Sequence, residues 1–383
     1  MRKKNILVCP LDWGLGHATR CVPLVTQFIK EGHQVIIGAD KNPLAFLKQE
    51  FPALKTVVIP GYEVSYSEKG NSLKLFYESI QFFNFIKKEH GFIDEIIEEY
   101  NIDMIVSDNR YGLWSKKVKS IIITHQLYVK AVLGEKIAHK KIEKLISNFD
   151  ECWIPDAEGQ PNLSGDLSHL KAFNYPHKFI GPLSRFTSLQ LLKSCINGPL
   201  EMQRNEQTFE YDIIAILSGP EPQRTIFEKM VLEQIERYNL KAIVVRGLPS
   251  SNVITRDEAT LSSGDEIASS VALPRYAENI KMFNHLPTAE LFNFIAKSKV
   301  VVCRAGYSSI MDLAALNKKA ILVPTPGQTE QEYLANYHHK KGGFYSQMQS
   351  EFDLKIGLDK IESFTPEYSF TNDVQLDSLL KKR

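Results

Sequence analysis

The sequence has few cysteines, almost no net charge and no long apolar run. Its five cysteines are odd in number and form no Cys-x-x-Cys pair, so we expect neither a disulfide framework nor a zinc site, and reduced thiols in the cytoplasm fit best. The 46 basic and 45 acidic residues leave a net charge of +1, so no global positive field favours nucleic acid as a partner. No window approaches the roughly 18 uninterrupted apolar residues that a membrane-spanning helix needs.

The composition is otherwise that of an ordinary globular protein, with 43% hydrophobic and 24% charged residues. Short apolar, β-branched runs alternate with helix-length amphipathic segments, which predicts a parallel sheet covered by helices. The predicted strands of a first series are Ile6–Cys9, Val35–Ile37, Thr56–Ile59, Met104–Val106, Ile121–Thr124 and Cys152–Pro155. Those of a second series are Ile213–Leu217, Ala242–Val245, Val300–Cys303 and Ala320–Val323.

Two such series predict an α/β protein of two doubly wound, Rossmann-like domains that face each other across a cleft. Residues 181–209 contain two Gly-Pro pairs and a polar stretch, so we place the hinge there. The expected domains are residues 1–180 and 210–383. Ligands of open parallel sheets bind beyond the carboxyl ends of the strands, so we look for chemistry in the strand-to-helix loops that border the cleft.

The first strand leads into a loop with two glycines, Gly14 and Gly16, and helical periodicity begins at about Thr19. The glycines let the backbone approach a ligand, and the start of the helix offers free N–H groups to an anion or a sugar oxygen. The loop lacks the third glycine of a dinucleotide fingerprint and the lysine of a P-loop. His17 follows the second glycine. A neutral imidazole is a natural general base, although local capping or packing explains this residue at least as well.

The corresponding loop of the second series offers groups that could bind phosphate. Ser218 and Gly219 supply a hydroxyl and a backbone N–H, and Arg224 adds charge near the start of a helix expected from about Thr225. A proline-rich loop with a solvated arginine is an equally good interpretation.

Residues 300–332 are the most informative segment, because a strand, a glycine turn, a helix, a second strand and a polar loop follow one another. Gly306 permits a close turn, and Ser308 and Ser309 lie at the start of the helix, where a diphosphate would be stabilised. Asp312 follows one turn later and could accept hydrogen bonds from ribose hydroxyls. Compensation of the helix dipole is the alternative role for this carboxylate.

This segment resembles the nucleotide-sugar-binding region of GT-B glycosyltransferases, most closely family 28, the family of MurG-type N-acetylglucosaminyltransferases. The resemblance rests on a Val-Val-Cys-Arg run, an Ala-Gly turn, an acidic residue on the next helix, a Val-Pro strand end and a Glu-Gln loop. The Gly-Leu-Gly-His loop at residues 14–17 is similar to the glycine-rich loop of the family's acceptor domain.

The resemblance implies a role for each matching residue. Asp312 would bind the ribose, Glu330 and Gln331 would meet the hydroxyls of the donor sugar, and His17 would be the base. The residues implied around the diphosphate are Ser218, Gly219, Gly306, Ser308 and Ser309. Arg304 is a further candidate for neutralising the leaving group, with a structural bridge behind its strand as the alternative.

Two residues at the ends of predicted strands complete the candidate site. Thr124-His125-Gln126 is similar to an element near the family's acceptor site, although Gln126 stands where the family has a glutamate. His125 is the second choice of base. Asp108 ends a strand on the cleft side and could support either histidine, and capping of the following turn is its alternative role.

The sequence contains no Asp-x-Asp pair, the element that holds a catalytic cation in the other large glycosyltransferase class. We therefore expect no metal and no cofactor, and helix ends and arginines would stabilise the departing diphosphate. Residues 73–100 mix aromatic and basic side chains, which fits either a helix packed on the core or weak peripheral contact with the inner face of the membrane.

The function predicted from the sequence is transfer of a sugar from a nucleoside diphosphate sugar to an unidentified hydroxyl acceptor. By resemblance the nucleotide is UDP, and UDP-N-acetylglucosamine is one candidate donor. A nucleotide-sugar epimerase of the same fold and a noncatalytic sugar-nucleotide sensor remain alternatives. An NAD-dependent oxidoreductase is the weakest, because no complete dinucleotide fingerprint is present.

Overall fold

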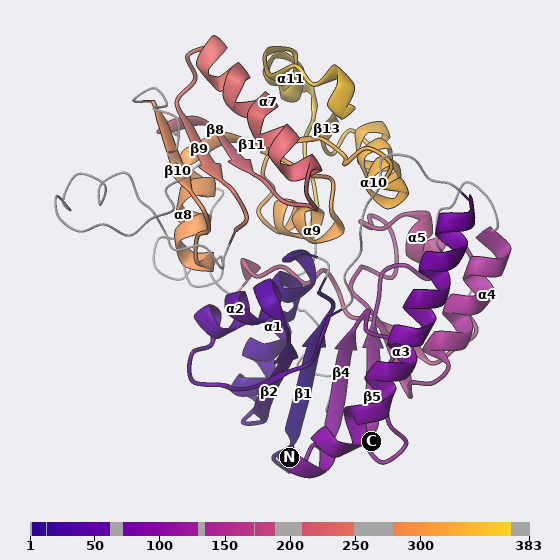
Figure 1. Ribbon diagram of the computed structural model, residues 1–383. Coiled ribbons are helices and arrows are strands. Elements are labelled where there is room, and N and C mark those ends of the chain that lie inside the picture. Colours follow the sequence, from indigo (N-terminus) through magenta and orange to yellow (C-terminus); the bar gives the residue numbers. More distant parts are fainter. Residues whose placement is uncertain are drawn as a thin grey trace.

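The computed structural model describes residues 2–12, 14–61, 72–128, 135–171, 173–187, 209–248 and 279–368, and it shows two parallel sheets, each covered by helices (Figure 1). The first sheet has the strand order β3-β2-β1-β4-β5-β6-β7, and the second has the order β10-β9-β8-β11-β12-β13. Every neighbouring pair of strands is parallel. The predicted fold class is therefore confirmed.

The first domain places its strands and helices in alternation. Its elements are β1 (Asn5–Pro10), α1 (Gly16–Lys30), β2 (Gln34–Ala39), α2 (Lys41–Glu50), β3 (Lys55–Val58), α3 (Ser72–Tyr100), β4 (Met104–Asp108), β5 (Lys119–Ile123), α4 (Glu135–Ile146), β6 (Glu151–Ile154), α5 (Asp166–His169) and β7 (His177–Phe179).

The second domain follows the same plan. Its elements are β8 (Tyr211–Ile216), α7 (Gln223–Arg237), β9 (Ala242–Val245), β10 (Ile280–Phe283), α8 (Thr288–Lys297), β11 (Ser298–Cys303), α9 (Tyr307–Ala315), β12 (Ala320–Leu322), α10 (Thr329–Lys340), β13 (Tyr345–Ser346), the 3-10 turns Gln349–Glu351 and Ile361–Ser363, and α11 (Leu354–Lys360) between them.

All ten predicted strands are present, and the described part of the chain contains three further strands that were not predicted. These are β7, β10 and β13, which lie at the edges of the two sheets. An edge strand is half exposed and needs no continuous apolar run, so its sequence carries a weaker signal than that of a central strand. The residues of β7, for example, are exposed or half-buried.

The start of α1 also differs from the prediction. The helix begins at Gly16 and not at about Thr19, because the Thr19 N–H already donates to the Leu15 carbonyl at 2.9 Å. His17 therefore lies in the first helical turn, where the backbone fixes its direction. Helix α7 likewise begins at Gln223, two residues before the expected start.

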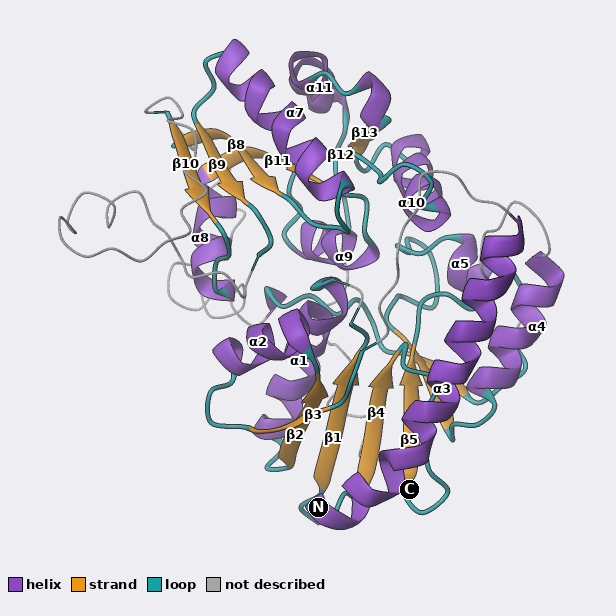
Figure 2. Cartoon of the chain, in the orientation of Figure 1, coloured by secondary structure: helices purple, strands orange, loops and turns teal. Residues whose placement is uncertain are grey.

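Buried apolar side chains form a cluster that continues from one domain into the other. Trp153 and Leu183 of the first part of the chain belong to the same cluster as Tyr307, Met311 and Leu334 of the second. Figure 2 shows α1 of the first domain and α9 of the second facing each other between the two sheets. The domain boundaries at residues 180 and 210 stay a prediction, and residues 188–208 of the expected hinge lie outside the described residues.

The segment considered for membrane contact is part of α3. Ile93, Ile96 and Ile97 of this helix are buried in the core of the first domain, which supports core packing for its second half. The side chains of residues 72–82 lie outside the described part of the chain. Within that part, no helix is both long enough and apolar enough to cross a membrane.

Candidate functional site

The carboxyl ends of the central strands of both sheets face the interface between the domains. In the first domain, α1 follows β1, Asp108 ends β4, and His125 lies just beyond β5. In the second domain, α9 follows β11 and α10 follows β12. Strand-to-helix connections from both domains thus meet at the position where parallel sheets bind their ligands.

Helix α9 contacts the first domain through its first two residues. The Tyr307 ring stacks on His125 with centroids 4.0 Å apart and planes inclined by 6°, and its hydroxyl donates to the Pro155 carbonyl at 2.8 Å. The Ser308 hydroxyl donates to the Gly16 carbonyl at 2.7 Å. A Cβ added at Gly16 would lie 3.2 Å from the Ser308 oxygen, so the close approach that this glycine allows is to Ser308.

A buried cluster of charged groups lies behind this interface. The Asp108 carboxylate, fully buried, accepts from Arg20 Nε at 2.6 Å and also from Arg20 Nη2. His17 Nδ1 lies 3.3 Å from Asp108 Oδ1. Burial alone would raise the pKa of Asp108, but the charges of Arg20 and His17 outweigh it and hold the pKa at about 2.

His17 has two competing partners at Nδ1. Asp108 favours a proton on that nitrogen, whereas Arg20 Nη2, 2.8 Å away, can only donate and favours a lone pair there. Burial lowers the pKa of His17, the positive charge of Arg20 lowers it further, and Asp108 opposes both. The ring is therefore neutral near pH 7, the form that a general base requires.

His125 has hydrogen-bond partners at both ring nitrogens. Arg20 Nη1 lies 3.2 Å from Nδ1, and Glu330 Oε1 of α10 lies 2.7 Å from Nε2. The amide of Gln126 also donates to Glu330. Burial alone would raise the pKa of Glu330, but the hydrogen bond with His125 and the nearby charge of Arg20 outweigh it and lower the pKa. The structure thus places Glu330, predicted to meet the donor sugar, against the two residues predicted to lie near the acceptor.

Asp312 is half-buried where the chain passes from the first domain towards the second. Its carboxylate accepts from the Ser184 hydroxyl at 2.6 Å and lies 3.5 Å from Arg185 Nε. Burial raises the pKa of Asp312, and Arg185 and Ser184 counteract it. The role of this carboxylate in binding ribose stays a prediction.

The residues predicted around the diphosphate all belong to the second domain, whereas Gly14 lies in the glycine loop of the first. Gly306 has an ordinary φ of −74°, so the turn does not require glycine, and a Cβ at this position would meet no atom within 4 Å. Gly219 and Gly14 have positive φ values of 110° and 76°. Ser218 and Ser309 are half-buried.

Three further predicted residues use their polar groups within the second domain. Arg224 donates to Glu221 and Glu228. Arg304 donates to the carbonyls of Val323, Pro324 and Gln223, which matches the structural alternative considered for it. Gln331 accepts from the Thr325 N–H at 2.9 Å. Because these contacts tie the three side chains to their own domain, we do not carry the three residues into the proposed mechanism.

Arg20 was not predicted as a site residue, although its side chain contacts Asp108 and both histidines. The signal was present, because positions three apart on a helix share a face, so Arg20 lies one turn beyond His17 on the same face of α1. Tyr307 was also missed, since its stacking on His125 depends on contact between the domains.

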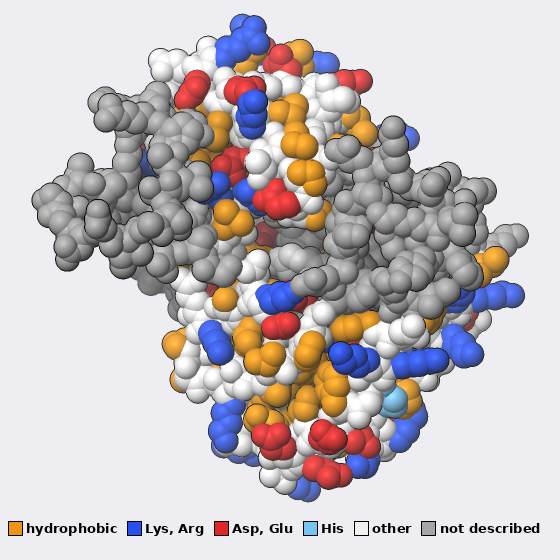
Figure 3. Space-filling model, viewed as in Figure 1, with side chains coloured by type: hydrophobic (Ala, Val, Ile, Leu, Met, Phe, Trp, Pro, Cys, Tyr) orange, Lys and Arg blue, Asp and Glu red, His pale blue; other side chains and the backbone are white. Residues whose placement is uncertain are grey.

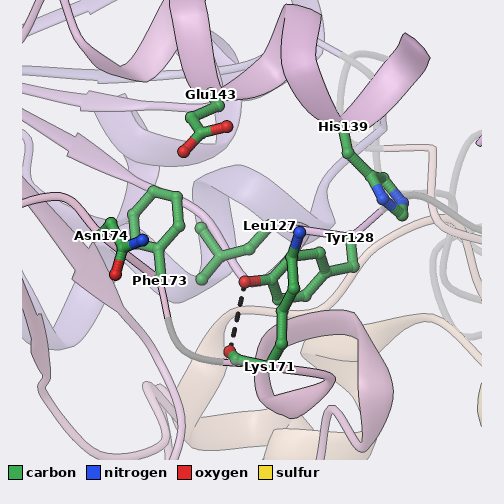
Figure 4. Close-up of a pocket in the computed structure, with 7 residues that line it drawn as sticks. All are labelled: Leu127, Tyr128, His139, Glu143, Lys171, Phe173 and Asn174. Carbon is green, nitrogen blue, oxygen red and sulfur yellow. Dashed lines mark hydrogen bonds between the residues drawn. The ribbon is translucent and has the colours of Figure 1, made fainter. Parts of the chain in front are cut away.

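Figure 4 shows a pocket of about 130 Å³ on the first domain. Its lining residues are Leu127, Tyr128, His139, Glu143, Lys171, Phe173 and Asn174, none of which was predicted as a site residue. Acidic and basic side chains are interspersed over the face of the molecule in Figure 3. Among the described residues, no three His, Cys, Asp or Glu side chains are grouped so that they could hold a metal ion.

Comparison with known proteins supports the fold and the resemblance. Residues 258–373 match the model of the glycosyltransferase family 28 C-terminal domain. The UDP-N-acetylglucosamine–N-acetylmuramyl-(pentapeptide) pyrophosphoryl-undecaprenol N-acetylglucosamine transferase of Caldanaerobacter subterraneus is 29% identical over 82 residues, which are 21% of this chain and 22% of the relative. An uncharacterized glycosyltransferase of Methanosarcina acetivorans is 22% identical over 86% of this chain and 79% of its own length.

A solved structure of MurG from Acinetobacter baumannii matches all of both chains with a TM-score of 0.53 and 15% identity. The protein therefore has the GT-B fold. It is similar to the MurG group of family 28, most clearly in its carboxy-terminal part, and the predicted resemblance is confirmed.

Proposed function

We propose that the protein is a metal-independent glycosyltransferase that moves a sugar from a nucleoside diphosphate sugar to an acceptor hydroxyl. The observation that carries the proposal is the His17–Asp108 pair, which lies at the interface with a domain similar to the nucleotide-sugar-binding domain of family 28. UDP is the proposed nucleotide and N-acetylglucosamine one candidate sugar, in line with the name of the Caldanaerobacter relative.

In the proposed reaction His17 is the base. This step requires the tautomer in which the His17 proton on Nδ1 is donated to Asp108, in place of the contact with Arg20 Nη2. The lone pair of Nε2 then accepts the proton of the acceptor hydroxyl. The acceptor oxygen then forms a bond to the anomeric carbon, the bond from that carbon to the phosphate oxygen breaks, and the nucleoside diphosphate leaves with the electron pair. Asp108 stabilises the positive charge that develops on His17.

His125 fits a different role from the one of second-choice base. Arginine cannot accept a hydrogen bond, so the contact with Arg20 requires the lone pair on His125 Nδ1. The proton then lies on Nε2, where Glu330 accepts it. In this arrangement His125 has no free lone pair for the acceptor. His17 differs because Asp108 is a second partner at its Nδ1 and can accept a proton there, so we assign the base role to His17 alone.

The proposed ribose contact predicts the effect of Asp312→Ala. Loss of a charged hydrogen-bond acceptor is expected to weaken UDP binding by about 1–3 kcal/mol in a protein that remains folded. Isothermal titration calorimetry measures the affinity directly. Ser184→Ala is the matched control, because it removes the present partner of Asp312 and keeps the carboxylate, so UDP should bind at least as tightly as to the wild type. Unchanged affinity in folded Asp312→Ala would remove this residue from the site.

Metal independence is tested with a chelator. Helix ends and backbone N–H groups are proposed to stabilise the leaving diphosphate, so transfer should proceed at an unchanged rate in excess EDTA. The assay follows release of the nucleoside diphosphate before and after addition of magnesium or manganese. Activity that disappears with the chelator and returns with either cation would contradict this account of the leaving group.

A further inference from the structure

Arg20 is the one residue of the cluster that contacts both histidines and Asp108. Its side chain is 2% exposed, and all three guanidinium nitrogens are used: Nε and Nη2 contact Asp108, Nη2 also contacts His17, and Nη1 contacts His125. A buried guanidinium with this many ionisable partners is costly unless every contact is made.

The chain of contacts continues into the second domain. His125 Nε2 lies 2.7 Å from Glu330 Oε1, so Glu330, His125, Arg20, Asp108 and His17 form one connected series. Only one neutral tautomer of His125 satisfies both of its contacts, with a lone pair on Nδ1 towards Arg20 and a proton on Nε2 towards Glu330.

We propose that Arg20 is a positioning residue for the transfer reaction: it fixes His125 in the Nε2–H tautomer that bonds Glu330 across the domain interface, and it holds Asp108 beside His17. This inference rests on the proposed function for its link to catalysis. Its structural part, the tautomer of His125, does not depend on any activity.

Two substitutions separate the geometry of Arg20 from its charge. Arg20→Lys keeps a positive charge but lacks the planar fork that reaches Asp108 and His125 together. Arg20→Met removes both. We expect each variant to lower kcat by about 10²-fold per folded molecule, the effect of a small misplacement of reacting groups.

The pH profile of kcat/KM distinguishes the two variants. The base must be deprotonated, and loss of the positive charge of Arg20 raises the pKa of His17, so the acid limb of Arg20→Met should move to higher pH. The limb of Arg20→Lys should stay near its wild-type position. The ionisable groups around His17 and Arg20 are Cys21 of α1, Asp108 and Tyr111 at and after β4, His125 after β5, Tyr307 of α9 and Glu330 of α10.

Arg110 provides a matched control. It is equally buried in the same domain, and its hydrogen bonds go to Glu89 and to the carbonyls of Ile59 and Pro60, not to either histidine. Arg110→Lys should lower the melting temperature without moving the acid limb. If Arg20→Met likewise destabilised the protein and left the limb in place, Arg20 would have a structural role only, and the inference would be overturned.

The decisive measurement is the ¹⁵N spectrum of the wild-type chain labelled at histidine, with the His125 signals assigned through their loss in His125→Gln. We expect a bare Nδ1 and a protonated Nε2, and loss of this preference in Arg20→Lys. A proton on His125 Nδ1 would overturn the inference whether or not the protein is active. Absence of any sugar transfer would instead overturn the proposed function, so the two failures are distinguishable.

Discussion

Replacing His17 by alanine is expected to lower kcat by about 10²- to 10⁴-fold, the usual contribution of a general base, with donor affinity nearly unchanged. The reason is the position of the ring. When the Nδ1 proton is donated to Asp108, the lone pair lies on Nε2, which is then the nitrogen that takes the acceptor proton. Single-turnover rates measure the chemical step, and calorimetry with UDP measures donor binding.

A histidine that only packs locally predicts a different outcome. Its loss would lower the melting temperature and preserve turnover per folded molecule. Melting curves of the wild type and of His17→Ala therefore accompany the kinetic measurements. A variant that melts early but retains its rate would remove His17 from the mechanism. His125 would not replace it, because both of its ring nitrogens already have partners.

Asp108→Ala is expected to reduce both stability and activity. The substitution leaves the Arg20 guanidinium buried without its carboxylate, which costs about 3–5 kcal/mol of the free energy of unfolding. It also removes the acceptor that holds the proton on His17 Nδ1, so kcat should fall as well. Denaturant titration gives the stability, and Asp108→Asn provides a milder variant for the kinetics if the alanine variant does not fold.

Glu89→Ala is the control for this experiment. Glu89 is as buried as Asp108 and forms the corresponding pair with Arg110, so its loss should cost similar stability. Transfer per folded molecule should not change, because Glu89 has no contact with either histidine. Equal loss of kcat in both variants would show that the effect of Asp108 reflects stability alone.

The acid stability of the wild type gives a second readout of the same pair. The pKa of Asp108 is lowered from 3.8 to about 2 by its partners, so the ionised carboxylate stabilises the folded state above pH 3.8. This contribution, about 2 kcal/mol, is lost as the pH falls through about 2. Asp108→Asn should not show this acid-dependent loss.

The central strands could be predicted from sequence because they are buried on both faces and read as continuous apolar runs. The four residues of β9, Ala242–Val245, were predicted without error, since all of them are buried. The edge strands β7 and β13 are short and partly exposed, so partial burial left no apolar run by which to find them.

The candidate site was predictable to the extent that residues lie at strand ends. Strands β1 and β4 are neighbours in the sheet, and Pro10 at the end of β1 is paired with Asp108. Because His17 follows β1 at the start of α1, its Nδ1 lies 3.3 Å from Asp108 Oδ1. The contact of Glu330 with His125 joins residues 205 positions apart and depends on how the two domains meet, which no local pattern specifies. The same is true of Ser184 and Asp312.

The most direct test of the central claim is the fate of the donor sugar. The wild-type protein is incubated with a panel of nucleoside diphosphate sugars and hydroxyl acceptors, and the nucleotide, the free sugar and the remaining donor are quantified. We predict that the bond between the anomeric carbon and the diphosphate of one donor is cleaved, with release of the nucleoside diphosphate in an amount equal to the sugar transferred to acceptor or water. A donor that is bound and recovered intact would indicate a sensor, and a donor recovered with an inverted ring carbon would indicate an epimerase. Either result would contradict transfer.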